Sequence, residues 1–190
     1  MNQDKNIFEI IFHARAGQGA KSAAEILAQA AMNEGKYIQA FPYYGPERSG
    51  APTKTYVRIS NKEIRTHEPI VDPDLSVVLD DTLLESTDVA KNITRNENLI
   101  INTKKSKEDI TEVLGGFDGN LKIIDATDIA MKTVGLPASN SVILGKIIQV
   151  IGVVKLDSLK EEFRKIFEGK IGKKMTEKNI LAIERGYDSL

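Results

Sequence analysis

The sequence predicts an α/β protein, a three-layer α/β/α sandwich around a mixed, mostly parallel sheet. Three short apolar segments, residues 75–79, 99–101 and 122–124, are each followed by polar residues and then by apolar residues at helical spacing. An earlier unit, residues 7–35, has the same order of strand, turn and helix. This repeated alternation predicts neighbouring parallel strands joined by short loops and helices.

The N-terminal third supplies one strand, one helix and a further set of strands. Residues 7–12 are apolar except for Glu9, which predicts a buried strand. The next helix is predicted by small and apolar residues at helical spacing, and Gly35 stands where a helix C-terminus favours glycine. Residues 37–41 and 53–60 predict two strands, and the Asn61-Lys62 turn predicts a hairpin partner at residues 63–66.

The remainder of the chain predicts mainly helices. Three of them follow the apolar strands, and an apolar helix at residues 141–153 should be buried by the sheet or by a partner. An amphipathic helix at 156–167, a basic connector at 169–174 and a last helix at 177–185, stopped by Gly186, complete the chain. The three helices after the strands are expected at residues 82–91, 107–114 and 127–134. With no repeat and no long linker, residues 1–190 are expected to form a single domain.

Composition narrows the class of protein. The 190 residues are 41% hydrophobic and 28% charged, which suits one domain with a substantial core. Lys plus Arg number 26 and Asp plus Glu 27, so the net charge is −1 and gives no reason to expect nucleic acid or an anionic membrane as partner.

The absence of cysteine excludes a disulfide framework, a thiolate nucleophile and a cysteine-ligated iron–sulfur cluster in this chain. Two histidines make a histidine-rich metal site unexpected. The first residues do not form an apolar signal segment, and the most apolar run, 142–154, is too short to span a bilayer. A cytoplasmic protein is therefore expected.

The glycine turn at residues 12–22 is the first candidate site. A strand runs into Gly17 and Gly19, and a helix opens at once behind them. Free N–H groups at a helix N-terminus favour an anion, and the turn also carries charged and polar side chains. The candidate contacts to a phosphate-bearing ligand are Arg15, Gly17, Gln18, Gly19 and Lys21. The alternative is a tight turn that only packs a helix on the sheet.

Two familiar nucleotide motifs fit this turn poorly. For a dinucleotide fold, Ser22 stands at the third glycine position, and the second strand ends without an acidic residue for the ribose. For a phosphate-binding P-loop, Arg15 and Ala20 stand where glycines are needed. NAD and ATP are therefore both disfavoured.

The second candidate is the loop around residues 42–52, in which three prolines and two glycines forbid regular structure. Tyrosine and arginine are enriched at interface hot spots. The sequence therefore predicts a partner-binding loop with contacts from Tyr43, Tyr44, Glu47 and Arg48. The alternative is a Glu47–Arg48 pair that bonds to the chain's own backbone.

For several other polar residues, both a structural role and a functional role are compatible with the sequence. His13 could be a base, but a core histidine with a hydrogen-bond partner is more common. Asp80, Asp81 and Asp125 follow strands and could gather around a cation, although helix N-caps are the favoured reading. Asn140 reads as a cap or a loop bond. Because no nucleophile–base pair, carboxylate pair or metal cluster stands out, no catalytic residue and no metal ligand is expected in this chain.

Several runs of residues resemble the gamma subunits of the pyruvate:ferredoxin oxidoreductase (pyruvate synthase) family. The first is His-Ala-Arg-Ala-Gly-Gln-Gly-Ala-Lys-Ser, which begins at His13. The resemblance extends over essentially the whole chain in the family's order, through residues 13–27, 35–42, 44–52, 57–60, 125–127, 140–145 and 179–187.

The resemblance implies a subunit of a complex that converts pyruvate, coenzyme A and oxidised ferredoxin to acetyl-CoA, carbon dioxide and reduced ferredoxin. It implies alpha, beta and delta subunits as partners. Thiamine diphosphate, with Mg²⁺, belongs to the alpha and beta chains, and the [4Fe-4S] clusters belong to the beta and delta chains. The gamma subunit lies near the coenzyme A region, so the turn from Arg15 to Lys21 is a candidate for a phosphate contact.

The chain departs from the family at two points. Ser49 stands where members often carry a second arginine, and Ala16 stands where they carry a glycine. Alternatives also stay open: a gamma subunit of a branched-chain 2-oxoacid enzyme, a stand-alone nucleotide- or flavin-binding protein, or a structural subunit that touches no substrate.

Overall fold

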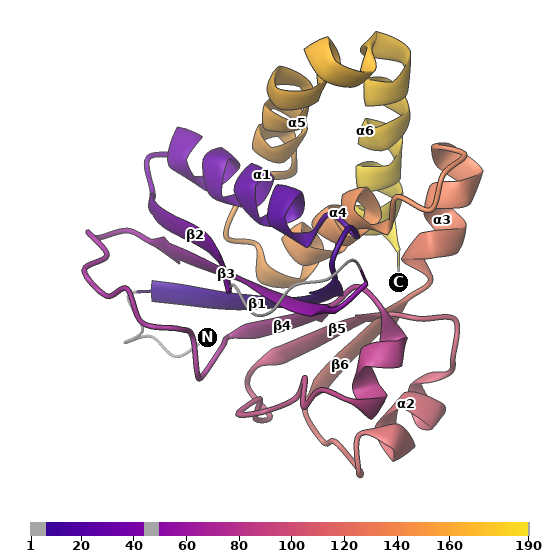
Figure 1. Ribbon diagram of the computed structural model, residues 1–190. Coiled ribbons are helices and arrows are strands. Elements are labelled where there is room, and N and C mark those ends of the chain that lie inside the picture. Colours follow the sequence, from indigo (N-terminus) through magenta and orange to yellow (C-terminus); the bar gives the residue numbers. More distant parts are fainter. Residues whose placement is uncertain (1–6, 44–49, 190) are drawn as a thin grey trace.

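The computed structural model describes residues 7–43 and 50–189 and contains a six-stranded sheet (Figure 1). The spatial order of the strands is β2-β3-β1-β4-β5-β6. β1 is parallel to β4, β4 to β5 and β5 to β6, whereas β3 is antiparallel to both β1 and β2. The strands are β1 (Ile7–Arg15), β2 (Tyr37–Tyr43), β3 (Pro52–Ser60), β4 (Leu75–Val78), β5 (Asn98–Asn102) and β6 (Asn120–Ile124).

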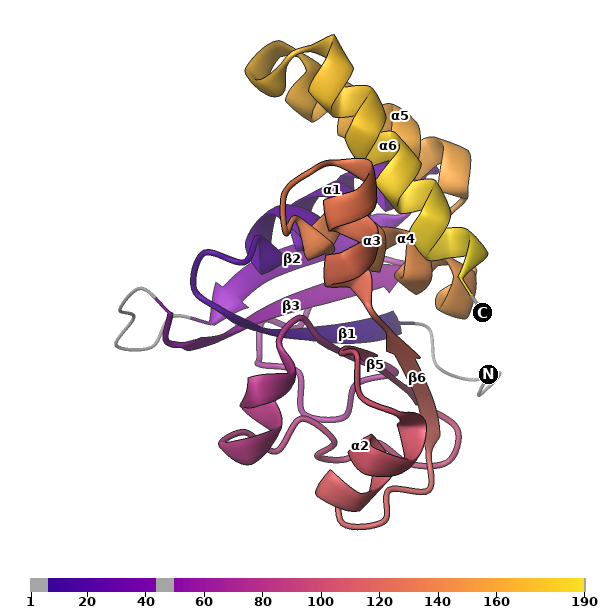
Figure 2. The ribbon, with the colours of Figure 1, turned by 90° about the vertical axis from the view of Figure 1, so that its right-hand side faces the viewer.

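Helices lie on both faces of this sheet, which confirms the predicted three-layer sandwich (Figure 2). The larger layer contains α1 (Ala20–Asn33), α3 (Ala126–Thr133), α4 (Ser139–Ile151), α5 (Leu156–Ile171) and α6 (Lys173–Asp188). The smaller layer contains the 3₁₀ helix η1 (Asp81–Glu85) and α2 (Lys107–Val113).

Alternation along β1 divides the core between the two faces. Ile10 and Phe12 are fully buried and belong to the cluster beneath α1, α4 and α6. Ile11 points to the opposite face, where it packs with Tyr56 and Ile70. Because successive side chains of a strand alternate, His13 shares the face of Ile11 and lies on the side away from α1.

The predicted hairpin partner at residues 63–66 is wrong. These residues form no strand, and two of the four, Glu63 and Arg65, are exposed. Both edges of β3 are already occupied, since Ser60 lies opposite Ile7 of β1 and Tyr37 of β2. The antiparallel partners of β3 therefore come from earlier in the chain.

The predicted helix at residues 82–91 is also wrong. Only the 3₁₀ helix η1 forms here, and it ends at Glu85. A single turn overlaps its end, in which the Thr87 amide donates to the Leu83 carbonyl at 2.8 Å. Ser86, Thr87 and Asp88 follow, and residues of these types favour turns over helix interiors.

The end of the chain differs from the prediction at two glycines. The expected connector at 169–174 is helical up to Ile171 and broken only at Gly172, whose φ is 78°. Gly186 does not stop the last helix but lies inside α6. A Cβ atom on Gly186 would lie 1.9 Å from the Val142 carbonyl oxygen of α4, so this glycine allows the two helices to touch.

The apolar helix is buried as predicted, and it is α4. Its one buried cation is Lys146, whose Nζ donates to the Ser189 carbonyl at 2.9 Å. Among the helices of the described residues, none is both long and apolar enough to cross a membrane.

Candidate functional site

The glycine turn joins the end of β1 to the start of α1. Gly17 and Gly19 have φ angles of 99° and 80°, in the left-handed region that favours glycine. Gly19 is the N-cap of α1, and no side chain caps this helix. The first turn of α1 therefore presents backbone N–H groups without a side-chain acceptor from its cap.

Arg15 connects this turn to two other segments. Its Nε and Nη2 donate to Thr82 Oγ1 at 3.0 and 2.7 Å. Its Nη1 donates to the Gly50 carbonyl at 3.2 Å, and its Nε lies 3.5 Å from Asp80 Oδ2. The guanidinium is thus committed to its own chain, while the side chain stays 32% exposed.

Gln18 completes the same network. Its Oε1 accepts from the Arg15 amide at 2.7 Å, and its Nε2 donates to Asp80 Oδ2 at 2.6 Å. Burial alone would raise the pKa of Asp80, but hydrogen bonds from Thr82 and Gln18, together with the Arg15 charge, hold this pKa below its ordinary value. Asp80 is therefore an ionised anchor at neutral pH.

Lys21 lies outside this network. It is exposed, and its Nζ is 3.8 Å from Glu25 Oε1, one turn further along α1. The structure thus brings together Arg15, Gly17, Gln18 and Gly19, while Lys21 is on the outer surface of α1. The sequence suggested Asp80 only as an N-cap or a cation ligand and did not suggest Thr82, because both lie more than 60 residues from the turn.

The second candidate loop emerges directly beside the glycine turn. The Ala16 amide donates to the Ala51 carbonyl at 2.9 Å, and the Gly50 amide donates to the Ala16 carbonyl at 3.4 Å. Tyr43 is 52% exposed and meets Tyr56 edge-on at 6.3 Å between ring centroids. The other predicted interface residues, Tyr44, Glu47 and Arg48, lie outside the described residues.

A cleft of about 730 Å³ follows the carboxyl ends of the parallel strands, where α/β sheets commonly bind ligands. Four aspartates line it, against one lysine, so the cleft itself disfavours a polyanion. An anion is better placed at the backbone of the glycine turn. The charged residues that line the cleft are Asp80, Asp81, Asp125, Asp128 and Lys104.

The aspartates have local structural roles. Asp80 and Asp125 are N-caps, as predicted, and accept from the amides of Thr82 and Asp128 at 3.0 and 2.9 Å. Asp81 lies in the first turn of η1 instead of capping it, and accepts from Thr103 Oγ1 at 2.6 Å. Within residues 7–43 and 50–189, no group of three histidines or acidic residues is placed to hold a metal ion.

Asn140 lies in the first turn of α4 and packs against the glycine turn. A Cβ atom on Gly19 would lie 2.6 Å from Asn140 Nδ2, whereas a Cβ atom on Gly17 would meet nothing within 4 Å. The two glycines therefore share a strained backbone conformation but differ in surroundings.

This difference gives a matched pair of variants. Gly19→Ala is expected to lower the free energy of unfolding by about 2–3 kcal/mol, through left-handed strain and displacement of Asn140. Gly17→Ala is expected to lower the free energy of unfolding by about 1–2 kcal/mol, from left-handed backbone strain alone. Urea unfolding followed by circular dichroism measures both. Equal losses for the two variants would contradict the packing of Asn140 against Gly19.

His13 is buried, with 3% of its surface exposed, as expected for a core histidine. The expected hydrogen-bond partner is absent, however, because Nδ1 has none among the described residues. Burial, and next the charge of Lys54, lower the pKa of His13 to about 3, so the imidazole is neutral at pH 7.

The sequence matches a family model described as pyruvate ferredoxin/flavodoxin oxidoreductase over residues 9–189. The chain belongs to this family.

Relatives within the pyruvate ferredoxin/flavodoxin oxidoreductase family match almost end to end. The pyruvate/ketoisovalerate oxidoreductases common subunit gamma of Thermococcus kodakarensis is 46% identical over 182 residues, 96% of each chain. The pyruvate synthase subunit PorC of Thermotoga maritima is 40% identical, over 98% of this chain and 96% of its own. The crystal structure of the Thermotoga maritima pyruvate oxidoreductase subunit PORC has a TM-score of 0.87 and 38% identity, over 97% of both chains.

Proposed function

We propose that this chain is the gamma subunit of a pyruvate:ferredoxin oxidoreductase complex. The complex converts pyruvate, coenzyme A and oxidised ferredoxin to acetyl-CoA, carbon dioxide and reduced ferredoxin. The observation that carries the proposal is the likeness to the Thermotoga maritima subunit, which combines 38% identity with a TM-score of 0.87 over 97% of both chains. At this level of similarity the backbone of the glycine turn and of its surroundings should be shared.

The reaction centres belong to partner chains in this proposal. Thiamine diphosphate, Mg²⁺ and the [4Fe-4S] clusters lie in alpha, beta and delta subunits, ferredoxin accepts the electrons, and the complex works in the cytoplasm. This chain has no cysteine with which to ligate a cluster. Its own role is to assist assembly and to contact coenzyme A.

The contact to coenzyme A is assigned to the glycine turn. Coenzyme A carries phosphates, and α1 presents an uncapped N-terminus beside two flanking cations, Arg15 and Lys21. The two cations contribute differently. Arg15 and Gln18 hold the turn in shape through Thr82 and Asp80, whereas Lys21 has only a long ion pair with Glu25 and can turn toward a phosphate.

Lys21→Gln is therefore the cleaner test of contact. In the intact complex it is expected to raise the Michaelis constant for coenzyme A about tenfold, which corresponds to one charged contact of about 1.4 kcal/mol. The Michaelis constant for pyruvate should not change, since pyruvate binds elsewhere. Lys174→Gln, an exposed lysine in the first turn of α6, is the matched control. An unchanged constant for coenzyme A in Lys21→Gln would favour a purely structural subunit.

A second function is favoured by one specific observation. The Thermococcus kodakarensis relative, at 46% identity, is named as common to pyruvate and ketoisovalerate oxidoreductases. In our proposal the gamma subunit does not contact the 2-oxoacid, so the same gamma chain could be a subunit of two complexes. In that case this chain would also belong to a branched-chain 2-oxoacid enzyme.

Oxygen-free purification through a tag on this chain tests both functions. One set of co-purifying chains, including a cysteine-rich chain and thiamine-binding chains, is expected for a dedicated pyruvate enzyme. Two sets of thiamine-binding chains would favour the shared subunit. Recovery of this chain alone, under conditions that preserve complexes, would contradict both.

A further inference from the structure

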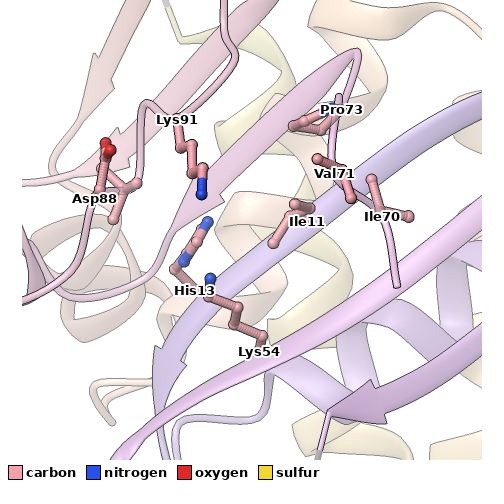
Figure 3. Close-up of a pocket in the computed structure, with 9 residues that line it drawn as sticks. Ile11, His13, Lys54, Ile70, Val71, Pro73, Asp88 and Lys91 are labelled. Carbon is pink, nitrogen blue, oxygen red and sulfur yellow. The ribbon is translucent and has the colours of Figure 1, made fainter. Parts of the chain in front are cut away.

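A small cavity lies on the sheet face opposite α1, away from the glycine turn. Its volume is about 140 Å³, and His13 lies in its wall (Figure 3). A second space of about 490 Å³ shares His13 and Lys54 with the first and is lined by Tyr43 and Tyr56. Tyr43 belongs to the predicted partner-binding loop, but the coenzyme A contact proposed for the glycine turn uses neither space.

The cavity contains an unsatisfied polar atom. His13 is 3% exposed, and its Nδ1 has no hydrogen-bond partner within residues 7–43 and 50–189. Buried polar atoms of native proteins are almost always hydrogen-bonded, so the unpaired Nδ1 points to a partner that the described residues do not supply, either a water molecule or a ligand. Burial and Lys54 keep the imidazole neutral at pH 7, and a neutral imidazole can donate from Nδ1 in the tautomer that carries the proton there.

The cavity is also positively charged. Lys54 lies opposite His13 in the β1–β3 register, and the side chains of Lys54 and Lys91 point toward the imidazole (Figure 3). In the part of the chain that the structure describes, neither lysine has a hydrogen bond or an ion pair. Asp88 also lines the cavity, but its carboxylate points away from His13 (Figure 3). Two cations that converge without a carboxylate between them favour an anion.

The remaining walls narrow the class of anion. Ile11, Ile70 and Val71 line the small cavity, and the two tyrosines line the adjoining space. A dianionic phosphate would have to lose its hydration against these apolar walls. A carboxylate carries one charge and loses less hydration free energy on entering the cavity. An apolar group attached to the carboxylate would pack against the apolar walls.

We propose that this cavity binds a small organic carboxylate. Its carboxylate lies between Lys54 and Lys91 and accepts a hydrogen bond from His13 Nδ1, and its apolar end lies against Ile11 and Val71. The site is non-covalent and independent of the glycine turn, so it does not depend on the gamma-subunit function.

Nuclear magnetic resonance of the full-length, ¹⁵N-labelled chain tests this site. The chain has only two histidines, so the imidazole nitrogens of His13 and His67 can be assigned with one variant, His67→Gln. The probe is isobutyrate, and its neutral isostere isobutyramide is the matched control, both at constant ionic strength in sodium chloride. We expect isobutyrate to shift the His13 signals saturably, and isobutyramide to leave them in place.

Variants separate the cavity from general charge effects. Lys91→Gln is expected to weaken isobutyrate binding at least tenfold, Lys91→Arg to retain it, and Lys174→Gln to leave it unchanged. Lys91 and Lys174 are both exposed, so folding should survive. The proposal is overturned if isobutyrate at concentrations up to about 50 mM causes no saturable shift of the His13 signals. Binding that weak would be far below the affinity expected from a few polar contacts. It is also overturned if isobutyramide shifts the His13 signals as much as isobutyrate does, or if Lys91→Gln binds isobutyrate unchanged. If Nδ1 is bonded only to a water molecule, isobutyrate will cause no saturable shift.

Discussion

Gly186→Ala is expected to unfold the chain, or to lower its free energy of unfolding by at least about 3 kcal/mol. The cause is the contact between α4 and α6. A Cβ atom on Gly186 would lie 1.9 Å from the Val142 carbonyl oxygen, and one on Gly145 would lie 1.9 Å from the Ile183 carbonyl oxygen. Neither backbone can give way by itself, so a methyl group at either position must push the two helices apart.

Gly169→Ala is the matched control for this effect. Gly169 is also inside a helix, α5, but a Cβ atom there would meet nothing within 4 Å. Alanine is the better helix former, so this variant should gain roughly 0.5–1 kcal/mol. Thermal and urea unfolding of the three proteins give the comparison. Comparable stability of Gly186→Ala and Gly169→Ala would contradict the close packing of α4 on α6.

Arg58→Met is expected to lower the free energy of unfolding by about 3–5 kcal/mol, the cost of breaking a buried ion pair. Arg58 is 2% exposed on β3, and its Nε donates to Glu9 Oε1 of β1 at 2.8 Å. Its Nη1 donates to Gln39 Oε1 of β2 at 3.3 Å, and its Nη2 donates to the Glu68 carbonyl at 2.8 Å. One side chain therefore joins three strands and the segment that follows β3.

Arg65→Met shows what a surface ion pair contributes. Arg65 Nη2 lies 3.0 Å from Glu63 Oε2, but the Arg65 side chain is 85% exposed. Its loss should cost less than about 1 kcal/mol. Urea unfolding at low and high salt measures both arginine variants, and only the Arg65 effect should depend strongly on salt. A small, salt-sensitive loss for Arg58→Met would show that this pair is not a buried anchor.

Local patterns were sufficient for most of the fold. Apolar runs followed by helical spacing predicted β4, β5 and β6 and the helices α2 and α3, because each signal lies within a few residues. The helix expected at residues 82–91 failed for a local reason, the turn-favouring residues 86–88, whereas two other predictions failed because distant residues decide. Residues 63–66 lost their strand because β1 and β2 occupy both edges of β3. Gly186 has the local signature of a helix end, and only the nearby Val142 backbone explains its place inside α6.

The candidate site was predictable as a turn but not as a network. Two glycines between a strand and a helix identify the turn, and their left-handed φ angles agree with it. The sequence does not show that Arg15 is bonded to Thr82, or that Gln18 is bonded to Asp80, because 67 and 62 residues separate these pairs. Likewise, His13 appears as an ordinary core histidine until the structure shows its unpaired nitrogen and the two lysines that face it.

The gamma-subunit function is tested most directly by the activity of the complex that purifies with this chain. The oxygen-free preparation is mixed with an oxidised viologen dye, pyruvate and coenzyme A, and dye reduction is followed by absorbance. We predict reduction that requires both pyruvate and coenzyme A and that is lost when this chain is removed from the preparation. A preparation in which this chain is present with its partners, but dye reduction does not respond to pyruvate and coenzyme A, would contradict the account.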